Sequence, residues 1–355
     1  MEIKTVNLHK KIGKIKILEN INANFEEGSV NVILGPNGAG KTSLLRQISL
    51  LDKASCGELF FDGQALTKIS IKAKTNLRRQ IGFIFQNPVM LNGTVFENVM
   101  YGLKVRGLKI DNDKIKKVIL MVGLLKKIKQ YAKILSGGEK QRLSLARILI
   151  LEPEVYIFDE PTANLDSVSV KAIENIIFEL SQLKKTVILA THNLSQARRF
   201  GQKLFFMNNG KIIQEGSVDD IFSRPISLDI AKHSFSENII HGKIIEENGQ
   251  KYLISNGMKI SVVADDEMYE VSAILRPEDI FVSKLPIESS ARNSFKGKIK
   301  KIESIGAVYD LTVHISGVDF ETVITKQSLV LMDLKIGDEI YLTFKATAVH
   351  LIRES

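Results

Sequence analysis

Short apolar runs alternate, over roughly the first two thirds of the chain, with segments in which apolar residues recur at helical spacing. Such runs predict buried strands. They cover residues 15–18, 30–34, 58–61, 81–85, 155–158, 186–190 and 203–207. Because a helix that links two strands keeps those strands parallel, the alternation predicts an α/β fold with a largely parallel sheet flanked by helices. A further amphipathic helix with a solvated basic face is predicted over 111–132.

The pattern changes beyond about residue 235. Short β-prone runs are separated there by Asn-Gly, Ile-Gly and Ser-Gly turns, with little helical period. This is typical of a small all-β barrel. One set of runs begins with Gly-Lys-Ile at 242–244 and another begins with the same tripeptide at 297–299. The two sets end with similar sequences, at 271–276 and 341–346. Two related β units are therefore predicted.

Length and charge agree with this division. A chain of 355 residues exceeds what one hydrophobic core usually serves, so we expect domains at 1–230 and 235–355. Residues 1–230 carry 34 Lys and Arg against 22 Asp and Glu, which gives a net charge of +12. The other 125 residues carry 15 against 18, which gives −3. The positive charge of the first domain suits polyphosphates, anionic lipids or nucleic acid, and charge alone does not choose among them.

The cellular compartment can be inferred from what the chain lacks. We find no run of about 18 apolar residues and no apolar core of a signal peptide near the start. The single cysteine, Cys56, cannot form an internal disulfide. We therefore expect a protein that stays in the reducing compartment where it is made.

One motif predicts a nucleotide site. The segment 35–42 satisfies G-x-x-x-x-G-K-[ST] between a predicted strand and a predicted helix. Backbone amides of such a loop cradle phosphates, Lys41 neutralises the β- and γ-phosphates, and Thr42 binds Mg²⁺. The predicted nucleotide-binding residues are Gly35, Pro36, Asn37, Gly38, Ala39, Gly40, Lys41, Thr42 and Ser43, together with Gln86.

Two carboxylates follow the apolar run 155–158. A buried strand of a parallel sheet delivers such acids to its carboxyl end, beside a phosphate loop. We expect Asp159 to hold Mg²⁺ and Glu160 to polarise the water that attacks the γ-phosphate.

At this point the sequence resembles a family. Residues 135–142, LSGGEKQR, are similar to the signature motif of ATP-binding-cassette ATPases. Gln86 resembles the family's glutamine loop, the segment 164–166 its D-loop and His192 its switch histidine, all in the family's order. The resemblance covers residues 1 to about 225 and implies a P-loop nucleotide hydrolase core with a helical subdomain at about 88–150.

The resemblance also implies how these residues work. Two chains would sandwich two MgATP, with Gln86 as a further Mg²⁺ ligand and His192 at the γ-phosphate. The residues expected to act in trans on the second copy are Ser136, Gly137, Gly138, Glu139 and Asp166. Two positions depart from the family: Glu139 replaces the usual glutamine, which leaves the backbone donors intact, and Ile12 stands where an aromatic residue usually stacks on adenine.

A cassette without membrane spans is similar to the separate nucleotide-binding subunit of prokaryotic importers. That resemblance implies a homodimer on the cytoplasmic face of the membrane, bound to permease subunits and served indirectly by an extracytoplasmic solute-binding protein, with no nucleic-acid partner. A soluble cassette ATPase of DNA repair or translation is the alternative from another class.

The C-terminal part resembles molybdate-binding barrels over residues 288–352, on the segments 289–293, 296–299 and 344–349. The resemblance implies an OB-like barrel in a tungstate or molybdate importer, and the segment 85–95 favours tungstate slightly. Sulfate, phosphate and ferric ion remain alternatives. A tetrahedral dianion needs several donors, and the candidates are Ser290, Arg292, Asn293, Lys345 and Thr347. The barrel could instead serve dimer contacts alone.

Overall fold

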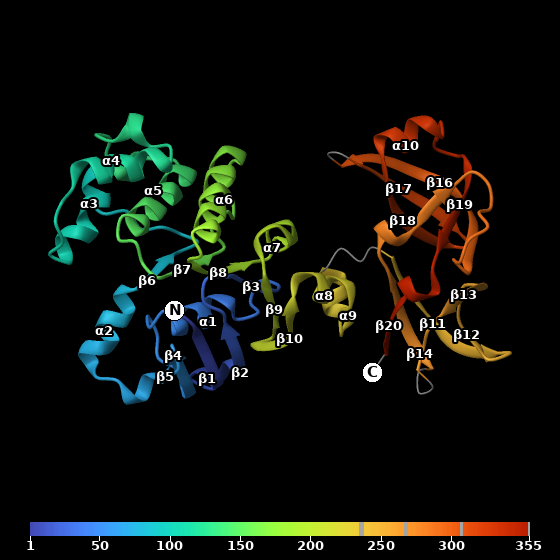
Figure 1. Ribbon diagram of the computed structural model, residues 1–355, viewed down its shortest axis with the longest axis horizontal. Coiled ribbons are helices and arrows are strands. Elements are labelled where there is room, and N and C mark those ends of the chain that lie inside the picture. Colours follow the sequence, from blue (N-terminus) through green and yellow to red (C-terminus); the bar gives the residue numbers. More distant parts are fainter. Residues whose placement is uncertain (234–237, 266–268, 306–307, 354–355) are drawn as a thin grey trace. The chain divides into compact units, whose positions relative to one another are not determined.

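The computed structural model describes the whole chain except residues 234–237, 266–268, 306–307 and 354–355 (Figure 1). It divides into two compact units, Met1–Asp219 and Asp220–Ser355. Of two short helices here, α8 (Val218–Ser223) spans this boundary, and α9 (Leu228–His233) overlaps the division expected at 230–235.

A six-stranded sheet forms the centre of the first unit, with the strand order β10-β9-β3-β8-β7-β6. Its strands are β3 (Val30–Leu34), β6 (Ile81–Ile84), β7 (Val155–Asp159), β8 (Thr186–Thr191), β9 (Lys203–Asn208) and β10 (Lys211–Ser217). All neighbours pair in parallel except β10, which runs antiparallel to β9. The predicted parallel sheet is confirmed, and every residue of β3, β7 and β8 is buried.

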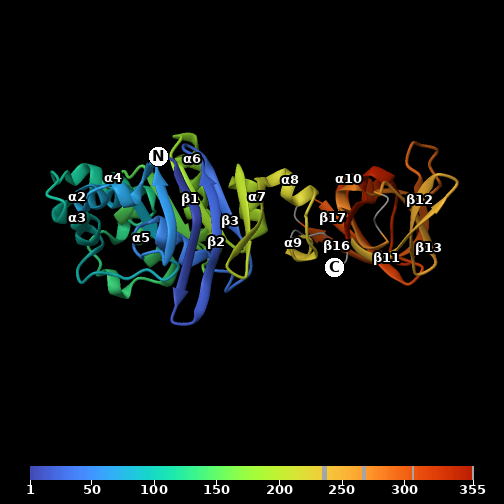
Figure 2. The ribbon, with the colours of Figure 1, turned by 90° about the horizontal axis from the view of Figure 1, so that it is seen from below.

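A second sheet of the first unit is antiparallel (Figure 2). It consists of β1 (Ile3–Ile12), β2 (Ile15–Phe25), β4 (Cys56–Phe61) and β5 (Gln64–Ala65), in the order β2-β1-β4-β5. The apolar runs at 15–18 and 58–61 belong to this sheet, which the sequence pattern did not separate from the parallel one. The rings of Phe25 and Phe205 meet at 4.9 Å and join the two sheets in one core.

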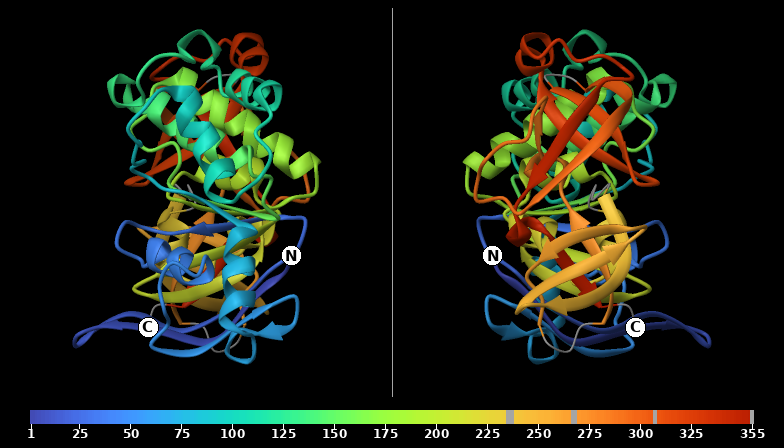
Figure 3. Two further views of the ribbon diagram at one scale, coloured as in Figure 1. Left: turned by 90° about the vertical axis from the view of Figure 1, so that its left-hand side faces the viewer. Right: turned by 90° about the vertical axis from the view of Figure 1, so that its right-hand side faces the viewer.

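Helices surround these sheets. They are α1 (Lys41–Ile48), α2 (Ile71–Arg79), α3 (Val95–Val105), α4 (Asn112–Met121), α5 (Gly137–Leu149), α6 (Ser167–Gln182) and α7 (Leu194–Phe200). In Figure 1 and in the left view of Figure 3, α3, α4 and α5 gather at the end of the unit away from the antiparallel sheet. They form the helical subdomain.

The helix predicted over 111–132 is shorter than expected. It ends at Met121, because Gly123 adopts φ +69° and its amide bonds to Leu120 O at 2.9 Å, while the Leu124 amide bonds to Ile119 O at 3.0 Å. This pair of bonds is the Schellman arrangement that closes a helix at a glycine. A 3₁₀ turn, Leu125–Lys127, follows.

The second unit contains two five-stranded antiparallel sheets (Figure 3, right). One has the order β13-β12-β11-β14-β20 and the other β18-β17-β16-β19-β15. The strands are β11 (Asn238–Glu247), β12 (Gln250–Ser255), β13 (Met258–Val262), β14 (Glu270–Leu275), β15 (Phe281–Ser283), β16 (Asn293–Ile305), β17 (Val308–Ile315), β18 (Val318–Thr325), β19 (Glu339–Phe344) and β20 (His350–Arg353). A short helix, α10 (Lys326–Leu331), follows β18.

The two sheets are copies of one another, which confirms the predicted pair of β units. The last strand of each β unit pairs with the sheet of the other β unit. Strand β15 follows β14 in the chain but pairs with β19, and β20 follows β19 but pairs with β14. The registers correspond, because Asn238 faces Leu275 in one sheet and Asn293 faces Phe344 in the other. Arg276, which follows β14, therefore corresponds to Lys345, which follows β19.

The duplication is held together by two equivalent asparagines. Asn293 is 1% exposed and accepts a bond from the Ser261 amide at 2.7 Å while donating to Ser261 O at 2.9 Å. Asn238 is 2% exposed and makes the corresponding pair with Glu321, at 2.7 and 2.8 Å. Each asparagine thus connects the first strand of one β unit to the third strand of the other β unit: β16 to β13, and β11 to β18.

We expect Asn293→Ala to speed hydrogen exchange at β13, because the Ser261 amide loses a buried acceptor, a loss of about 1–3 kcal/mol. Asn238→Ala should act in the same way on β18 and leave β13 protected. Hydrogen–deuterium exchange by mass spectrometry of the full chain measures both. Unchanged exchange at 258–262 in Asn293→Ala would contradict this account.

Candidate active site

The phosphate loop connects the end of β3 to the start of α1. Two of its glycines are required by geometry. A Cβ on Gly35 would lie 2.0 Å from Met207 O, and Gly40 adopts φ +101° immediately before the helix. Strand, loop and helix therefore have the arrangement that the motif predicts, with the amino end of α1 facing the place for the phosphates.

Lys41, the first residue of α1, is the buried cation of the site. Its side chain is 6% exposed, and its ammonium donates to Gly35 O at 2.7 Å and to Pro36 O at 3.0 Å. The same nitrogen lies 3.1 Å from Glu160 Oε1. A buried charge needs this compensation, and polyphosphate oxygens can supply the same compensation when a nucleotide binds.

The next residue of α1 meets the acid at the end of β7. The Thr42 hydroxyl donates to Asp159 Oδ1 at 3.0 Å. Burial raises the pKa of the Asp159 carboxyl, while the bond from Thr42 opposes that rise. A hydroxyl and a carboxylate oxygen this close form a hard oxygen donor set, the kind that Mg²⁺ prefers. The residues present therefore fit the expected metal.

Glu160 follows β7 with a left-handed backbone at φ +47°, and its amide donates to Ala190 O in β8 at 2.9 Å. Its carboxylate is 9% exposed, with Oε2 lying 2.5 Å from His192 Nδ1. Because β7 and β8 are neighbours in the sheet, their carboxyl ends place the acid and the histidine side by side. Glu160 is held between a cation and an imidazole.

A cavity of about 390 Å³ joins these groups. Its lining residues are Ile17, Asn37, Gly38, Ala39, Gly40, Lys41, Thr42, Ser43, Gln86 and Glu160. The structure thus brings Gln86, which is distant in sequence, to the phosphate loop. Ile12 is 62% exposed at the end of β1 and is not among the lining residues, whereas Ile17 is. Sequence reasoning missed Ile17, since no motif marks an apolar residue of an antiparallel strand.

The signature segment lies outside this cavity, at the start of α5. The Ser136 hydroxyl accepts a bond from the Glu139 amide at 3.3 Å, and Glu139 accepts one from the Ser136 amide at 3.1 Å. This capping box explains why glutamate serves at position 139. Lys127 lies 2.5 Å from Glu139 and is the main cause of the lowered pKa of that carboxyl.

Gly138 packs against the amino end of α6. A Cβ there would lie 2.2 Å from Ser169 Oγ and 2.7 Å from Asp166 Oδ2. Asp166 caps α6 by accepting a bond from the Ser169 amide at 2.9 Å, which lowers the pKa of its carboxyl. The segment 136–139 and Asp166 therefore form one surface of the chain, separate from the phosphate loop.

The fold and the site define a P-loop nucleoside triphosphate hydrolase. The model of the ABC transporter family matches residues 18–163, and the TOBE domain model matches residues 289–351. The chain is 32% identical to the molybdate/tungstate import ATP-binding protein WtpC of Pyrococcus horikoshii, over 98% of this chain and 99% of the relative. The chain therefore belongs to the ABC transporter family of ATP-binding proteins and is an ATPase.

Two further similarities bear on its interpretation. The sulfate/thiosulfate import ATP-binding protein CysA of Mannheimia succiniciproducens is 31% identical over 96% of both chains. A solved dimeric ATP-binding cassette bound to ADP and phosphate is 32% identical, with a TM-score of 0.56 over 61% of this chain and 98% of its own. In the part of the chain that the structure describes, no helix is long and apolar enough to cross a membrane.

We expect Glu160→Gln to lower ATP turnover by about a hundredfold or more while ATP still binds, because the amide cannot take a proton from the attacking water. Phosphate release and equilibrium nucleotide binding measure the two effects. Glu154→Gln is the matched control, since the Glu154 carboxylate, directly before the same strand, lies 3.8 Å from Lys185 Nζ and forms no other ion pair with a described residue. Undiminished turnover in Glu160→Gln would remove Glu160 as the base.

We expect weak discrimination between ATP and GTP, with dissociation constants within about threefold of each other. Ile17 offers the base an apolar surface without an aromatic ring or a hydrogen bond that reads its edge. Competitive binding of the two nucleotides measures this, and Ile17→Ala should weaken both alike. A strong preference for ATP would contradict the expectation.

Proposed function

We propose that the chain is the ATP-hydrolysing subunit of an importer for a tetrahedral oxyanion, either tungstate or molybdate. Two features support the proposal: an importer subunit matches over nearly the whole chain, and the C-terminal unit has a groove with cationic side chains. The choice of solute depends on this groove. Apart from the phosphate loop, it is the feature of the described structure that suits an oxyanion.

In the proposed cycle, two copies of the chain enclose two ATP molecules. Thr42, Gln86 and Asp159 would hold Mg²⁺ at the phosphates, which supplies positive charge when it is bound. Glu160 orients and deprotonates the attacking water, and His192 steadies that carboxylate and contacts the γ-phosphate. The surface formed by 136–139 and Asp166 faces the nucleotide of the second copy. The dimeric relative bound to ADP and phosphate supports this arrangement.

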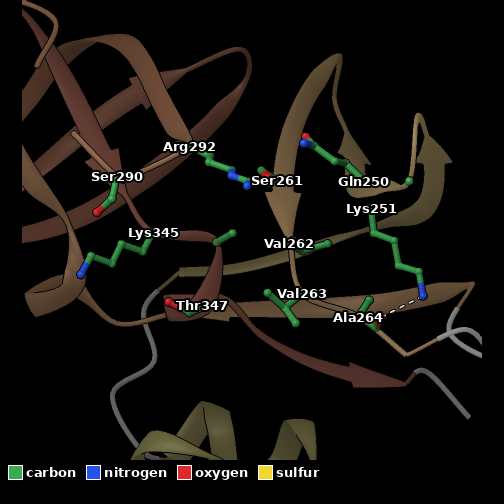
Figure 4. Close-up of a pocket in the computed structure, with 12 residues that line it drawn as sticks. Gln250, Lys251, Ser261, Val262, Val263, Ala264, Ser290, Arg292, Lys345 and Thr347 are labelled. Atoms are coloured by element: carbon green, nitrogen blue, oxygen red, sulfur yellow. Dashed lines mark hydrogen bonds between the residues drawn. The ribbon is translucent and has the colours of Figure 1, made fainter. Parts of the chain in front are cut away.

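The groove of the C-terminal unit measures about 580 Å³ (Figure 4). Four of the five predicted oxyanion residues line it: Ser290, Arg292, Lys345 and Thr347. Gln250 and Lys251 also line it and were not predicted, and Lys251 donates to Ala264 O at 2.9 Å. Asn293 is not a lining residue, because both ends of its amide bond to the Ser261 backbone. We therefore assign Asn293 to positioning β13 and β16.

The charge of the groove suits an anion. Its described lining residues include three cations and no carboxylate. In Figure 4 Arg292 reaches toward Ser261, whereas Lys345 extends to the opposite side. Arg292 and Lys345 form no ion pair with any residue that the structure describes. Binding would therefore require the exposed Lys345 side chain to turn toward the anion, which costs side-chain entropy.

The duplicated unit provides a comparison. At the position equivalent to Lys345, Arg276 donates from Nε to Asp279 Oδ2 at 2.9 Å and from Nη2 to Oδ1 at 3.2 Å. Ala348 stands where Asp279 would be. One copy of the site thus has an internal carboxylate for its cation, and the other copy leaves its cation to solvent or to an external anion.

The solute proposal rests on this charge. The described lining of the groove has no carboxylate to bind a ferric cation, whereas sulfate and phosphate share the tetrahedral shape and remain competitors. We further propose that the chain lies at the cytoplasmic face of the membrane as a homodimer. It would be bound to permease subunits, with the solute-binding protein reached through them. A soluble cassette ATPase is disfavoured, since the relatives named above are import proteins along their full length.

We expect the full chain, with ADP filling the phosphate loop, to bind tungstate and molybdate in calorimetric titration and to bind sulfate and phosphate more weakly. Lys345→Gln should weaken oxyanion binding by about tenfold or more, because a charge-assisted bond is lost. Arg276→Gln, the equivalent substitution in the other β unit, is the matched control and should leave binding unchanged.

Each outcome separates the alternatives. If all four anions bind equally well, the groove does not distinguish them, and sulfate and phosphate remain candidate solutes. If none of the four anions gives a binding heat, the assignment as an ATPase still holds, and the barrel is assigned to dimer contacts. Loss of binding in Arg276→Gln but not in Lys345→Gln would place the site in the other unit.

A further inference from the structure

Positive charge is concentrated in the helical subdomain. Residues 104–133 contain ten Lys and Arg residues and two Asp residues, which gives this segment a net charge of +8. The whole first domain, residues 1–230, has a net charge of +12. Most of the charge of the domain therefore lies in one short segment, which contains none of the residues predicted for the nucleotide site.

Helix α4 belongs to this segment and has one buried face. Ile115, Val118 and Ile119 are buried, and the helix packs against α3 and α5 (Figure 1). The opposite face of α4 is exposed and contains Lys116 and Lys117. The core of the helical subdomain thus uses one side of α4 and leaves the other side to solvent.

Apolar side chains are exposed where α4 ends. Leu120 is 59% exposed and Met121 is 50% exposed. Leu125, which is 39% exposed, begins the 3₁₀ turn that follows α4 and packs against it. Leu120 and Met121 each lie four residues after a lysine, so a lysine is their neighbour on the helix surface. Adjoining exposed apolar side chains, unlike single ones, mark contact surfaces.

We call this surface the α4 patch. It consists of Lys116, Lys117, Leu120, Met121, Leu125 and Lys126, all of which are exposed.

The lysines of the α4 patch have little local compensation. Lys116 Nζ lies 3.6 Å from Asp113 Oδ1, a contact between two exposed groups that contributes little. Lys117 and Lys126 form no ion pair with any residue that the structure describes. Together with the excess of cations around it, the patch therefore attracts an anionic partner.

Lysines beside exposed aliphatic side chains suit an anionic lipid surface. The ammonium groups attract lipid phosphates, while aliphatic side chains and lysine stems enter the boundary between headgroups and acyl chains. Nucleic acid would use the charge but not the aliphatic groups, because its partners bind phosphates with Arg and stack bases on aromatic rings. The α4 patch contains neither Arg nor an aromatic residue.

We propose that the α4 patch binds anionic membrane lipids directly. Leu120, Met121 and Leu125 enter the headgroup region, and the three lysines of the patch lie at the lipid phosphates. The proposal goes beyond the importer function, because it gives the chain a membrane contact of its own that needs no permease. It also determines which side of the helical subdomain faces the membrane.

The test measures flotation of the purified full chain with vesicles in the absence of any permease. One set of vesicles contains phosphatidylglycerol and phosphatidylcholine, and the other contains phosphatidylcholine alone. We expect binding to the first set to be at least about tenfold tighter, and to weaken as salt rises from about 0.05 M to about 0.5 M, because salt screens the charges. Equal binding to both sets, or binding to neither, would overturn the proposal.

Substitutions locate the contact on the chain. Lys116→Gln combined with Lys117→Gln should weaken binding to the anionic vesicles by about twentyfold, since each lysine near such a surface contributes about fivefold. Leu120→Gln should weaken it by about fivefold, because an apolar side chain no longer leaves water. This second variant changes a side chain that is already exposed, so the fold should be retained.

Lys171→Gln combined with Lys184→Gln is the matched control. Both lysines are exposed, one on α6 and one just after it, and neither forms an ion pair with a described residue. The control removes the same charge and leaves the α4 patch intact, so we expect it to bind vesicles like the unchanged chain. If the control loses as much binding as the double α4 variant, net charge alone attracts the chain and the α4 patch is not the site.

Two further measurements separate the alternatives. ATP hydrolysis should be unchanged in the α4 variants, because the patch lies outside the nucleotide cavity. Normal hydrolysis with lost vesicle binding supports the proposal, whereas variants that keep both activities overturn it. If the variants lose binding to duplex DNA but not to vesicles, the patch serves nucleic acid and the lipid proposal is wrong. Failure of oxyanion binding would overturn the proposed solute and leave the lipid contact standing.

Discussion

The buried ammonium of Lys41 is the constraint on which the nucleotide site depends. A charge that is 6% exposed must be compensated, and here two loop carbonyls and Glu160 compensate it. Phosphate oxygens are stronger partners for an ammonium than neutral carbonyls. Binding of a nucleotide therefore rearranges the partners of Lys41 and alters the surroundings of Glu160 in the same step. The cation proposed to bind the phosphates thus also contributes to the charge environment of Glu160, the proposed base.

The parallel sheet makes that arrangement possible. Glu160 directly follows β7 and His192 directly follows β8, so two neighbouring strands whose residues are all buried fix the positions of the acid and the histidine. The phosphate loop leaves β3, which pairs with β8 on its other side. Three adjacent strands thus determine the spacing of Lys41, Glu160 and His192. Among the described residues that line the cavity, none belongs to α3, α4 or α5, and Gln86 comes from the loop that follows β6.

Much of this could be predicted from the sequence, because the patterns that indicate it lie within short segments of the chain. Apolar runs located the strands of the parallel sheet, and the phosphate-loop motif located Lys41 and Thr42. The end of α4 was not predicted, because the helical spacing of apolar residues continues past Gly123. The left-handed backbone of Gly123 ends the helix all the same. Long-range contacts from side chains to backbone, such as Gln141 to Phe85 O and Asn293 to Ser261, left no pattern at all. A side chain that bonds to a backbone group places no demand on the identity of the residue that it contacts.

The C-terminal unit shows how duplication can separate structure from binding. Both copies keep the asparagine that connects the units, since its loss would leave buried backbone groups unpaired in either copy. The cation that follows the fourth strand is also kept, as Arg276 in one copy and Lys345 in the other. The residue three positions later differs: Asp279 accepts two bonds from Arg276, whereas the equivalent residue, Ala348, has no side-chain acceptor for Lys345. In the first β unit the fold itself supplies a carboxylate for Arg276. In the second β unit it does not, so Lys345 is available to a ligand.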